Sequence, residues 1–306
     1  MPLDIAVISE KLGTYASQDT TKIADEALVR GHTVHEVCPA DVSQVEGRLI
    51  AKARLYTGGD AADRQEHIRV DLEDMDVIHF RPNPPVDMSY LTTLYLLDRI
   101  KDKVLVINDP QSIIRFPEKI FPLEFPEFTP PTLISRDVDE IRDFTDRHQD
   151  VVIKPLYEYG GRGIARVTSA AFDEELVRAR LAEGSPPLVS QAFLPGITAG
   201  DKRIFFIGGD VAGAFVRIPK HGSYIANIAQ GGSIHRTTIT PREEELARLL
   251  GPKLVERGIY ICGIDVIDDH VTEINITSSV GFSQIEELYG EKPQIALWDL
   301  IEKKTA

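Results

Sequence analysis

Short apolar runs alternate with amphipathic segments along the first third of the chain. The apolar runs, which predict buried strands, are residues 4–8, 32–37, 77–80 and 104–107. The segments with helical spacing are residues 18–30, ended by Gly31, and 91–100. Strands that alternate with helices predict an open, parallel α/β sheet with its ligands at the carboxyl ends of the strands. The loops 9–20 and 81–87 lie at those ends, and Arg81 could bind a carboxylate there through two hydrogen bonds.

The pattern changes after a segment rich in Pro and Phe, residues 108–131, which indicates a domain junction. Helices are predicted at 137–150, 171–182, 243–257 and 285–304, and strands at 150–155, 164–167 and 187–194. A hairpin is predicted at 200–217, turning at Gly208-Gly209-Asp210. Residues 219–236 show no apolar periodicity, which predicts a mobile loop. We therefore expect three lobes, at residues 1–122, 123–195 and 196–306.

A second hairpin, residues 262–275, has two β-branched runs around Asp268-Asp269-His270. A two-residue loop would pair Ile264 with Glu273, whereas a three-residue loop pairs Ile267 with Val271 and sets Asp265 opposite Glu273. The second register also places Ile264, Val266, Ile274 and Ile276 on one apolar face, so the apolar pattern favours it.

This register brings the oxygen atoms of Asp265, Glu273 and Asn275 together on the opposite face. Mg²⁺ takes one or two carboxylates and completes its octahedron with water and substrate phosphates. In an isolated hairpin, a solvated acidic edge would be the simpler interpretation. Asn is depleted in strands, however, and is less expected beside Glu273 on such an edge, so the choice depends on the rest of the chain.

Composition narrows the class of protein. The chain has 306 residues, 42% of them hydrophobic, and a net charge of −14, which argues against nucleic acid or an anionic membrane as partner. The amino-terminal residues lack the pattern of a secretory signal, and no apolar run is long enough to span a bilayer. Cys38 and Cys262 cannot form a disulfide framework. We expect a cytoplasmic protein.

Two lysines and a glycine loop are candidate phosphate ligands. Lys154 ends a predicted strand and is followed by Gly160 and Gly161, whose backbone N–H groups could approach phosphate oxygens closely. Lys119 stands alone in an apolar segment, where a surface position is the simpler interpretation. The loop matches neither GxxxxGK[ST] nor a helix-opening GxGxxG, so P-loop and Rossmann sites are not indicated.

The order of the candidate residues along the chain resembles that of the ATP-grasp ligases. This order is Lys119, Lys154 with its glycines, Arg203, Arg217, an Asn/Gly-containing loop and Asp265…Glu273-x-Asn275. The similarity is strongest to the bacterial glutathione synthetase family, through Gly200-Asp-Lys-Arg203, Arg217-Ile-Pro219 and Thr272-Glu-Ile-Asn275. The resemblance implies an N-terminal α/β lobe followed by two α+β lobes that clamp ATP, and a homo-oligomer.

It also implies roles. Lys119, Lys154, Gly160 and Gly161 would bind the ATP phosphates, Gln191, Ala192, Phe193 and Leu194 would bind adenine, and Asp201 would lie near the nucleotide. Asp265, Glu273 and Asn275 would hold Mg²⁺, or Mn²⁺ in its place. Arg203, Arg217 and Lys154 would act in catalysis. Arg81, Arg217, Asn227 and Ser278 would contact the peptide substrate.

The chain departs from the family pattern at two positions. Ile225-Ala226-Asn227 replaces the usual Arg-Gly-Asn, and Ser283 replaces an Arg. The leading hypothesis is the ATP-dependent joining of γ-glutamylcysteine and glycine. A related ligase for another small peptide or amino acid is the alternative, and a nucleotide-binding protein without turnover is a third hypothesis.

Overall fold

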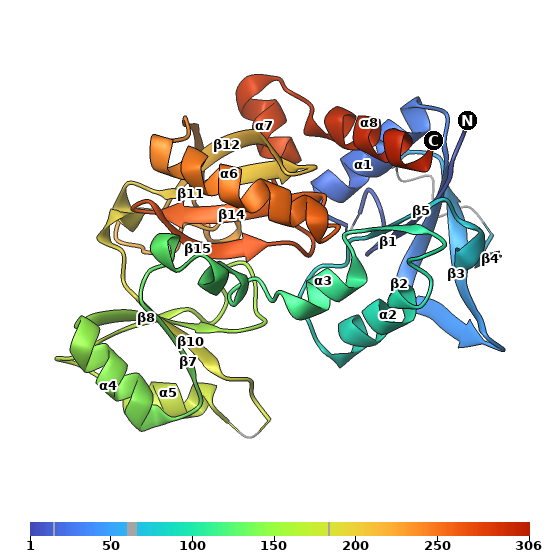
Figure 1. The fold of residues 1–306 in the computed structure, drawn as a ribbon. Coiled ribbons are helices and arrows are strands. Elements are labelled where there is room, and N and C mark those ends of the chain that lie inside the picture. Colours follow the sequence, from blue (N-terminus) through green and yellow to red (C-terminus); the bar gives the residue numbers. More distant parts are fainter. Residues whose placement is uncertain (15, 60–65, 183) are drawn as a thin grey trace.

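The computed structural model describes residues 1–14, 16–59, 66–182 and 184–306, which form three sheets (Figure 1). The N-terminal lobe holds a six-stranded sheet in the order β4-β3-β2-β1-β5-β6. Its strands are β1 (Asp4–Ile8), β2 (Thr33–Val45), β3 (Arg48–Tyr56), β4 (Ile68–Asp71), β5 (Val77–Phe80) and β6 (Leu105–Ile107). Its helices are α1 (Gln18–Val29), α2 (Met88–Asp98) and α3 (Pro110–Arg115).

The predicted parallel sheet is correct for four of these strands. β2, β1, β5 and β6 are parallel neighbours, whereas β3 and β4 pair antiparallel, a hairpin that the sequence interpretation missed. β2 runs on to Val45 and turns through Glu46 and Gly47, both with positive φ. β3 alternates buried and exposed positions along most of its length, so period-2 alternation was the signal for this strand.

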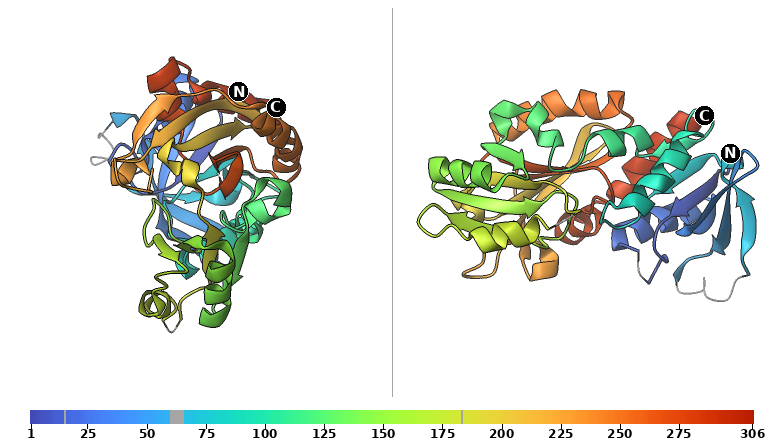
Figure 2. Two further views of the ribbon diagram at one scale, coloured as in Figure 1. Left: turned by 90° about the vertical axis from the view of Figure 1, so that its left-hand side faces the viewer. Right: turned by 90° about the horizontal axis from the view of Figure 1, so that it is seen from below.

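The second lobe along the chain, which we call the lid lobe, contains an antiparallel sheet in the order β7-β10-β8-β9. Its elements are β7 (Thr132–Ser135), α4 (Val138–His148), β8 (Asp150–Pro155), β9 (Ala165–Thr168), α5 (Glu174–Arg180) and β10 (Leu188–Ala192). Apolar side chains of α4, α5 and this sheet form a core cluster of their own. In the view from below, the lid lobe and the N-terminal lobe lie at opposite ends of the molecule (Figure 2).

The C-terminal lobe contains the antiparallel sheet β13-β12-β11-β14-β15. Its elements are β11 (Asp201–Ile207), β12 (Asp210–Ile218), β13 (Ser233–Arg236), α6 (Pro241–Glu256), β14 (Ile261–Ile267), β15 (His270–Asn275), α7 (Phe282–Tyr289) and α8 (Pro293–Thr305). The single closing helix predicted at 285–304 is wrong: Gly290, with φ of 75°, separates α7 from α8. The predicted loop 219–236 ends in β13, which pairs with β12.

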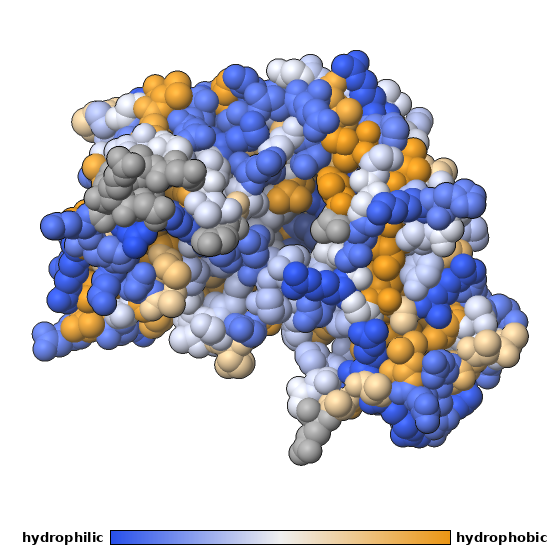
Figure 3. All heavy atoms as spheres, turned by 180° about the vertical axis from the view of Figure 1, so that it is seen from behind, coloured by the Kyte–Doolittle hydropathy of each residue, from blue (hydrophilic) through white to orange (hydrophobic). Residues whose placement is uncertain are grey.

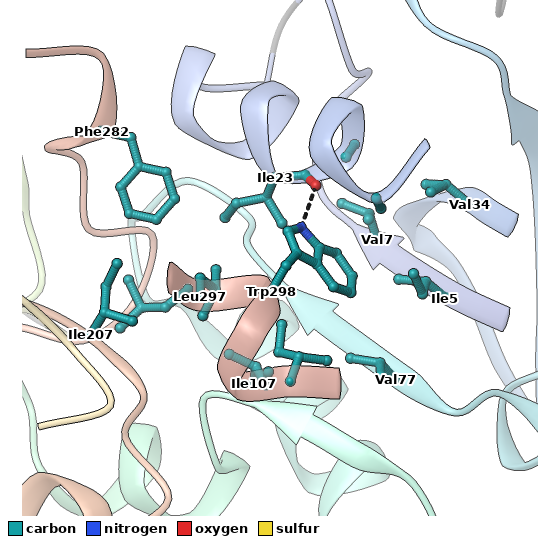
Figure 4. Packing of buried hydrophobic residues seen from close by; sticks show 14 of the residues in the cluster. Ile5, Val7, Ile23, Val34, Val77, Ile107, Ile207, Phe282, Leu297 and Trp298 are labelled. Carbon is teal, nitrogen blue, oxygen red and sulfur yellow. Dashed lines mark hydrogen bonds between the residues drawn. The ribbon is translucent and has the colours of Figure 1, made fainter. Parts of the chain in front are cut away.

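One apolar core joins the N-terminal and C-terminal lobes. Trp298 of α8 is fully buried against residues of β1, α1 and β5, and its indole nitrogen donates a 2.8 Å hydrogen bond to the Ile23 carbonyl (Figure 4). Phe205 and Phe282 of the C-terminal lobe belong to the same cluster. These two lobes therefore form one packed unit, from which the lid lobe projects. In the part of the chain that the structure describes, no helix has the length and apolarity needed to cross a membrane.

Candidate active site

A cleft of about 800 Å³ lies between the lid sheet and the C-terminal sheet. The structure brings most of the predicted site residues to its walls. These are Lys119, Lys154, Gly160, Gly161, Gln191, Ala192, Phe193, Leu194, Asp201, Asn227, Asp265 and Glu273. Residues from the domain junction, both sheets and the loop after β12 thus converge on one cavity, although they are spread over more than half of the chain.

The 262–275 hairpin pairs Asp265 with Glu273, as predicted, but through a different turn. Ile267 pairs with His270, so the loop has two residues, Asp268 and Asp269, both with positive φ. The register then shifts between Asp265 and Val266, which leaves Thr272 as an extra residue on β15. This β-bulge restores the pairing that burial of Ile264 and Ile274 requires. The predicted three-residue loop is therefore wrong, and the predicted carboxylate pair is confirmed.

Two arginines surround Asp265. Arg203, its neighbour on β11, donates from Nε to Oδ1 at 2.5 Å and from Nη2 to Oδ2 at 2.9 Å. Arg217 Nη2 lies 2.8 Å from Asp265 Oδ1 and donates to Asp201 Oδ2 at 2.5 Å. Burial alone would raise the pKa of Asp265, but the two guanidinium charges outweigh it and hold this pKa well below its usual range. Asp265 is therefore ionised.

Asp201 behaves differently. Burial raises its pKa to about 6, although the charge of Arg217 opposes the shift. Asp201 and Arg217 face each other across β11 and β12, at the edge of the cleft. The pKa of Asp201 is therefore shifted in the opposite direction from that of Asp265, although Arg217 contacts both carboxylates.

Both lysines are buried in the cleft wall. Lys154 Nζ donates a 3.0 Å hydrogen bond to Gln191 Oε1, and burial lowers the pKa of its ammonium group. Lys119 Nζ donates to the Glu158 carbonyl at 2.6 Å and lies 3.8 Å from Glu273 Oε1. The surface position considered for Lys119 is excluded, since this residue is 7% exposed. Two desolvated cations facing one cavity favour an anionic ligand such as a polyphosphate.

The loop after β12 covers the glycine loop of the lid lobe. A Cβ atom added to Gly161, whose φ is +78°, would lie 2.8 Å from Asn227 Oδ1 and 2.8 Å from Ile225 Cγ2. Only glycine allows this approach with a left-handed backbone. The two loops therefore meet at the cleft, which both of them line.

The donor set at the hairpin fits a divalent cation. Asp265 and Glu273 are paired carboxylates, and Asn275 Nδ2 donates to Asp265 Oδ2 at 3.2 Å, so its amide group also reaches this point. Among the residues that the structure describes, no three His, Cys, Asp or Glu side chains form a metal-binding group. Two carboxylates and one amide suit Mg²⁺, which takes its remaining ligands from water and phosphate.

Five predicted residues are not among those that line the cleft: Arg81, Arg203, Arg217, Asn275 and Ser278. Arg203 and Arg217 reach it through Asp265, whereas Arg81 lies in the N-terminal lobe and donates from Nη2 to the Ser279 carbonyl at 2.8 Å. Arg81 is 2% exposed, and its Nη1 has no hydrogen-bond partner among the described residues. Ser278 is half-buried in the same loop.

Sequence reasoning missed two acidic residues that hold this loop. Glu118 Oε1 accepts hydrogen bonds from the N–H groups of Ile276 and Thr277 and from the Thr277 hydroxyl. Asp19 accepts from three consecutive N–H groups, residues 281–283, and from the Ser283 hydroxyl. The only local signals were a Glu beside Lys119 and an Asp in the first turn of a helix.

Solved structures with the same fold include a synthetase and an ATP-grasp ligase. D-cycloserine synthetase DcsG matches with a TM-score of 0.72 and 13% identity over 99% of both chains, and the ATP-grasp ligase PsnB with 0.66 and 17% over 99% of both. The fold, and the cleft of cations and carboxylates between its two sheets, define an ATP-grasp enzyme, an ATP-dependent ligase that forms a C–N bond.

The family follows from the sequence. Residues 3–114 match the prokaryotic glutathione synthetase N-terminal domain, and residues 118–290 match the prokaryotic glutathione synthetase ATP-grasp domain. The chain belongs to the prokaryotic glutathione synthetase family. The glutathione synthetase of Bradyrhizobium diazoefficiens is 39% identical over the full length of both chains. That of Agrobacterium fabrum is 40% identical over 94% of this chain and 92% of its own.

Proposed function

We propose that this protein is an ATP-dependent glutathione synthetase that joins γ-glutamylcysteine to glycine and releases ADP and phosphate. The observation that supports it best is the cleft in which Lys119 and Lys154 face Asp265 and Glu273, in a chain of this family. ATP would lie between the two sheets, with adenine against residues 191–194 and its phosphates at the two lysines and the glycine loop.

The reaction needs no covalent enzyme intermediate. The peptide carboxylate attacks the γ-phosphorus of ATP, ADP leaves, and the resulting acyl phosphate is captured by the amine of glycine with loss of phosphate. Arg203 and Arg217, which both contact Asp265, would orient the carboxylate and neutralise the charge of the transferred phosphate. Lys154 would hold the γ-phosphate in line with the attacking oxygen.

Asp265, Glu273 and Asn275 would hold Mg²⁺, or Mn²⁺ in its place. The cation would neutralise phosphate charge when bound. In the unliganded cleft, Arg203 occupies both carboxylate oxygens of Asp265. We infer that Arg203 would turn toward the substrate once a cation binds to Asp265. The Asp265 carboxylate would then pair with Arg203 before the cation binds and with the metal ion afterwards.

The contact between the loop 219–236 and the glycine loop would serve to exclude water from the cleft. Water would hydrolyse an acyl phosphate before the amine could attack it. Ile225 and Asn227 meet Gly161 over the cleft, and residues 219–236 would act as a mobile lid that opens for substrate exchange.

The test is phosphate release from Mg-ATP with γ-glutamylcysteine, measured with and without glycine, with the products identified by mass. Release that depends on glycine, with glutathione formed, is the expected result. Release with other amines but not with glycine would support the related ligase. The two departures from the family pattern favour this alternative, since neither residue supplies the charge of an arginine: Ile225 is apolar, and the Ser283 hydroxyl donates to Asp19. ATP binding without any release would leave only a nucleotide-binding protein.

We also propose a cytoplasmic location and a homo-oligomer. The cytoplasm suits the two free cysteines, Cys38 at the surface and Cys262 in the core. The predicted lobe limits at residues 122 and 195 stand as part of the same proposal. The predicted helix 91–100 is not available as an interface for such an oligomer through its apolar face, because Leu94, Leu97 and Ile100 are buried in the N-terminal core.

A further inference from the structure

A second cavity, of about 790 Å³, adjoins the ATP cleft on the side of the N-terminal lobe. Neighbouring residues divide the two spaces: Lys119 lines the ATP cleft, Glu118 lines the second cavity, and Glu158 lines both. The face of the molecule opposite to that of Figure 1 is hollowed between the N-terminal lobe, at the left, and the lid lobe, at the lower right (Figure 3). The second cavity is therefore a direct neighbour of the ATP cleft, with Glu158 on the boundary between them.

The two spaces differ in the charge of the residues that line them. No lysine or arginine lines the second cavity within the described ranges, and its only carboxylates are Glu118 and Glu158. Its other walls are mostly apolar and include Val86, Leu91, Ile113, Ile114, Phe116 and Leu156. The ATP cleft, by contrast, is lined by Lys119 and Lys154, and Arg203 and Arg217 contact its lining residue Asp265 from behind. A ligand that reaches from one space into the other meets cations at one end and carboxylates at the other.

Glu118 has an oxygen to offer such a ligand. All three of its side-chain hydrogen bonds go to Oε1, and Oε2 accepts none from the residues that the structure describes. Burial raises the pKa of this carboxyl group, while the Thr277 hydroxyl and Lys119 lower it. The nearby Tyr90 hydroxyl is buried and without a partner among the described residues. A cation brought to Oε2 would stabilise the ionised carboxylate.

The spacing suits a dipeptide. Glu273 lines the ATP cleft and Thr277 lines the second cavity, and four residues of chain span at most about 14 Å. Extended γ-glutamylcysteine measures roughly 9 Å from its amino nitrogen to its cysteinyl carboxyl carbon, by ordinary bond lengths. The greatest possible separation of these two lining residues is thus of the same order as the length of one dipeptide.

We propose that the second cavity binds the amino end of the peptide substrate, with its ammonium group at Glu118 and Glu158 and its methylene chain against the apolar wall. The cysteinyl carboxylate then lies at Arg203 and Arg217, where it reacts. This assignment rests on the proposed function and adds a specificity rule: the enzyme reads the α-ammonium group of the γ-glutamyl residue and not the α-carboxylate beside it.

Three substrates test the rule with the wild-type enzyme, Mg-ATP and glycine. They are γ-glutamylcysteine, glutarylcysteine, which lacks the amino group, and 4-aminobutyrylcysteine, which lacks the α-carboxylate. Loss of a charge-assisted hydrogen bond predicts a KM roughly ten- to a hundred-fold higher for glutarylcysteine. 4-Aminobutyrylcysteine should stay within about threefold of the parent, because the described lining of the cavity holds no cation for the missing carboxylate.

Variants connect the rule to the cavity. Glu118→Gln keeps an oxygen acceptor for Thr277 but removes the charge, so it should raise KM for γ-glutamylcysteine and leave KM for glutarylcysteine unchanged. Glu158→Gln should act in the same direction if Glu118→Gln folds poorly. Glu127→Gln, at an exposed position of the same junction, is the control and should leave both values unchanged.

The outcomes are distinct. Equal KM values for glutarylcysteine and the parent peptide, or a loss confined to 4-aminobutyrylcysteine, would overturn the assignment while glutathione synthesis stands. A Glu118→Gln variant that lowers kcat equally for all three substrates would make Glu118 a positioning residue for Thr277 only, which also overturns it. Failure of the wild type to form glutathione from γ-glutamylcysteine would instead refute the proposed function.

Discussion

Arg203 and Asp265 form a bidentate ion pair in the interior of the C-terminal sheet, with nitrogen–oxygen distances of 2.5 and 2.9 Å. The pair is nearly inaccessible to solvent, with side-chain exposures of 6% and 7%. The guanidinium group thus compensates a buried carboxylate at the point where a divalent cation would bind.

Removing this arginine should destabilise the unliganded protein. Arg203→Met leaves Asp265 with Arg217 as its remaining cationic partner, and breaking a buried pair costs about 3–5 kcal/mol. Because a bound cation would replace the lost charge, Mg-ATP should raise the melting temperature of the variant more than that of the wild type. Thermal unfolding with and without Mg-ATP measures both effects. Arg178→Met, at an exposed ion pair with Glu174, should change stability by less than about 1 kcal/mol.

Glu273→Gln should abolish most turnover without unfolding the protein. The substitution keeps the shape of the side chain and removes a negative charge, so we expect kcat to fall by about 10²-fold or more. The concentration of Mg²⁺ needed for half-maximal rate should rise. Glu287→Gln, at an exposed position of α7, is the matched control. Wild-type kinetics in Glu273→Gln would exclude this carboxylate from the metal site.

Substitutions at two adjacent glycines should distinguish the effect of backbone strain from that of steric crowding. Gly160 and Gly161 both have positive φ, 64° and 78°, but a Cβ atom meets nothing within 4 Å at Gly160 and would crowd Asn227 and Ile225 at Gly161. Gly161→Ala should therefore reduce kcat much more than Gly160→Ala, since only the first substitution prevents the loop of residues 219–236 from packing against the glycine loop. Phosphate released without glutathione formation measures the leakage of water. Equal kinetics in the two variants would show that the loop contact has no role in turnover.

Trp298→Ala should destabilise two lobes at once. The side chain fills the core shared by β1, α1 and α8, and such a truncation costs about 3–5 kcal/mol. Chemical denaturation should show the N-terminal and C-terminal lobes unfolding together in one transition. Ile295→Ala, an exposed position of the same helix, should leave the transition nearly unchanged. Separate transitions for the two lobes in the wild type would contradict a shared core.

His79 should make the protein less stable in acid. It is fully buried, neither ring nitrogen has a partner among the described residues, and its ring lies 5.5 Å from that of Trp298. Burial lowers its pKa to about 3. The unfolded chain then binds a proton that the folded chain does not, so this contribution is present above pH 6.5 and is lost as the pH falls toward 3.

Between pH 7 and 5 the loss should be about 2 kcal/mol. Urea denaturation of His79→Leu over this range should show a smaller dependence on pH than the wild type. His221→Leu, at an exposed position, provides the comparison. Identical pH profiles for His79→Leu and the wild type would mean that His79 is protonated in the folded state or that its charge is compensated.

The apolar pattern alone was enough to pair Asp265 with Glu273. A sheet with one buried face tolerates a single register, because a slip by one residue would expose Ile264 and Ile274 to water. The turn was beyond this reasoning: the bulge at Thr272 leaves the apolar face unchanged, so the pattern could not tell a two-residue turn with a bulge from a three-residue loop. The same alternation in β3 was present in the sequence and was overlooked.

Local sequence was also enough to select Lys154, Gly160 and Gly161 as candidate phosphate ligands, since a strand end followed by glycines is a short-range pattern. The places of Glu118 and Asp19 were decided by the tertiary structure alone. Glu118 binds Thr277 across 159 residues, and Asp19 binds Ser283 across 264. A carboxylate in a helix or a junction looks the same in sequence whether it meets water or an unpaired N–H group. The packing of the N-terminal lobe against the C-terminal lobe supplies those N–H groups, and only the folded chain brings them together.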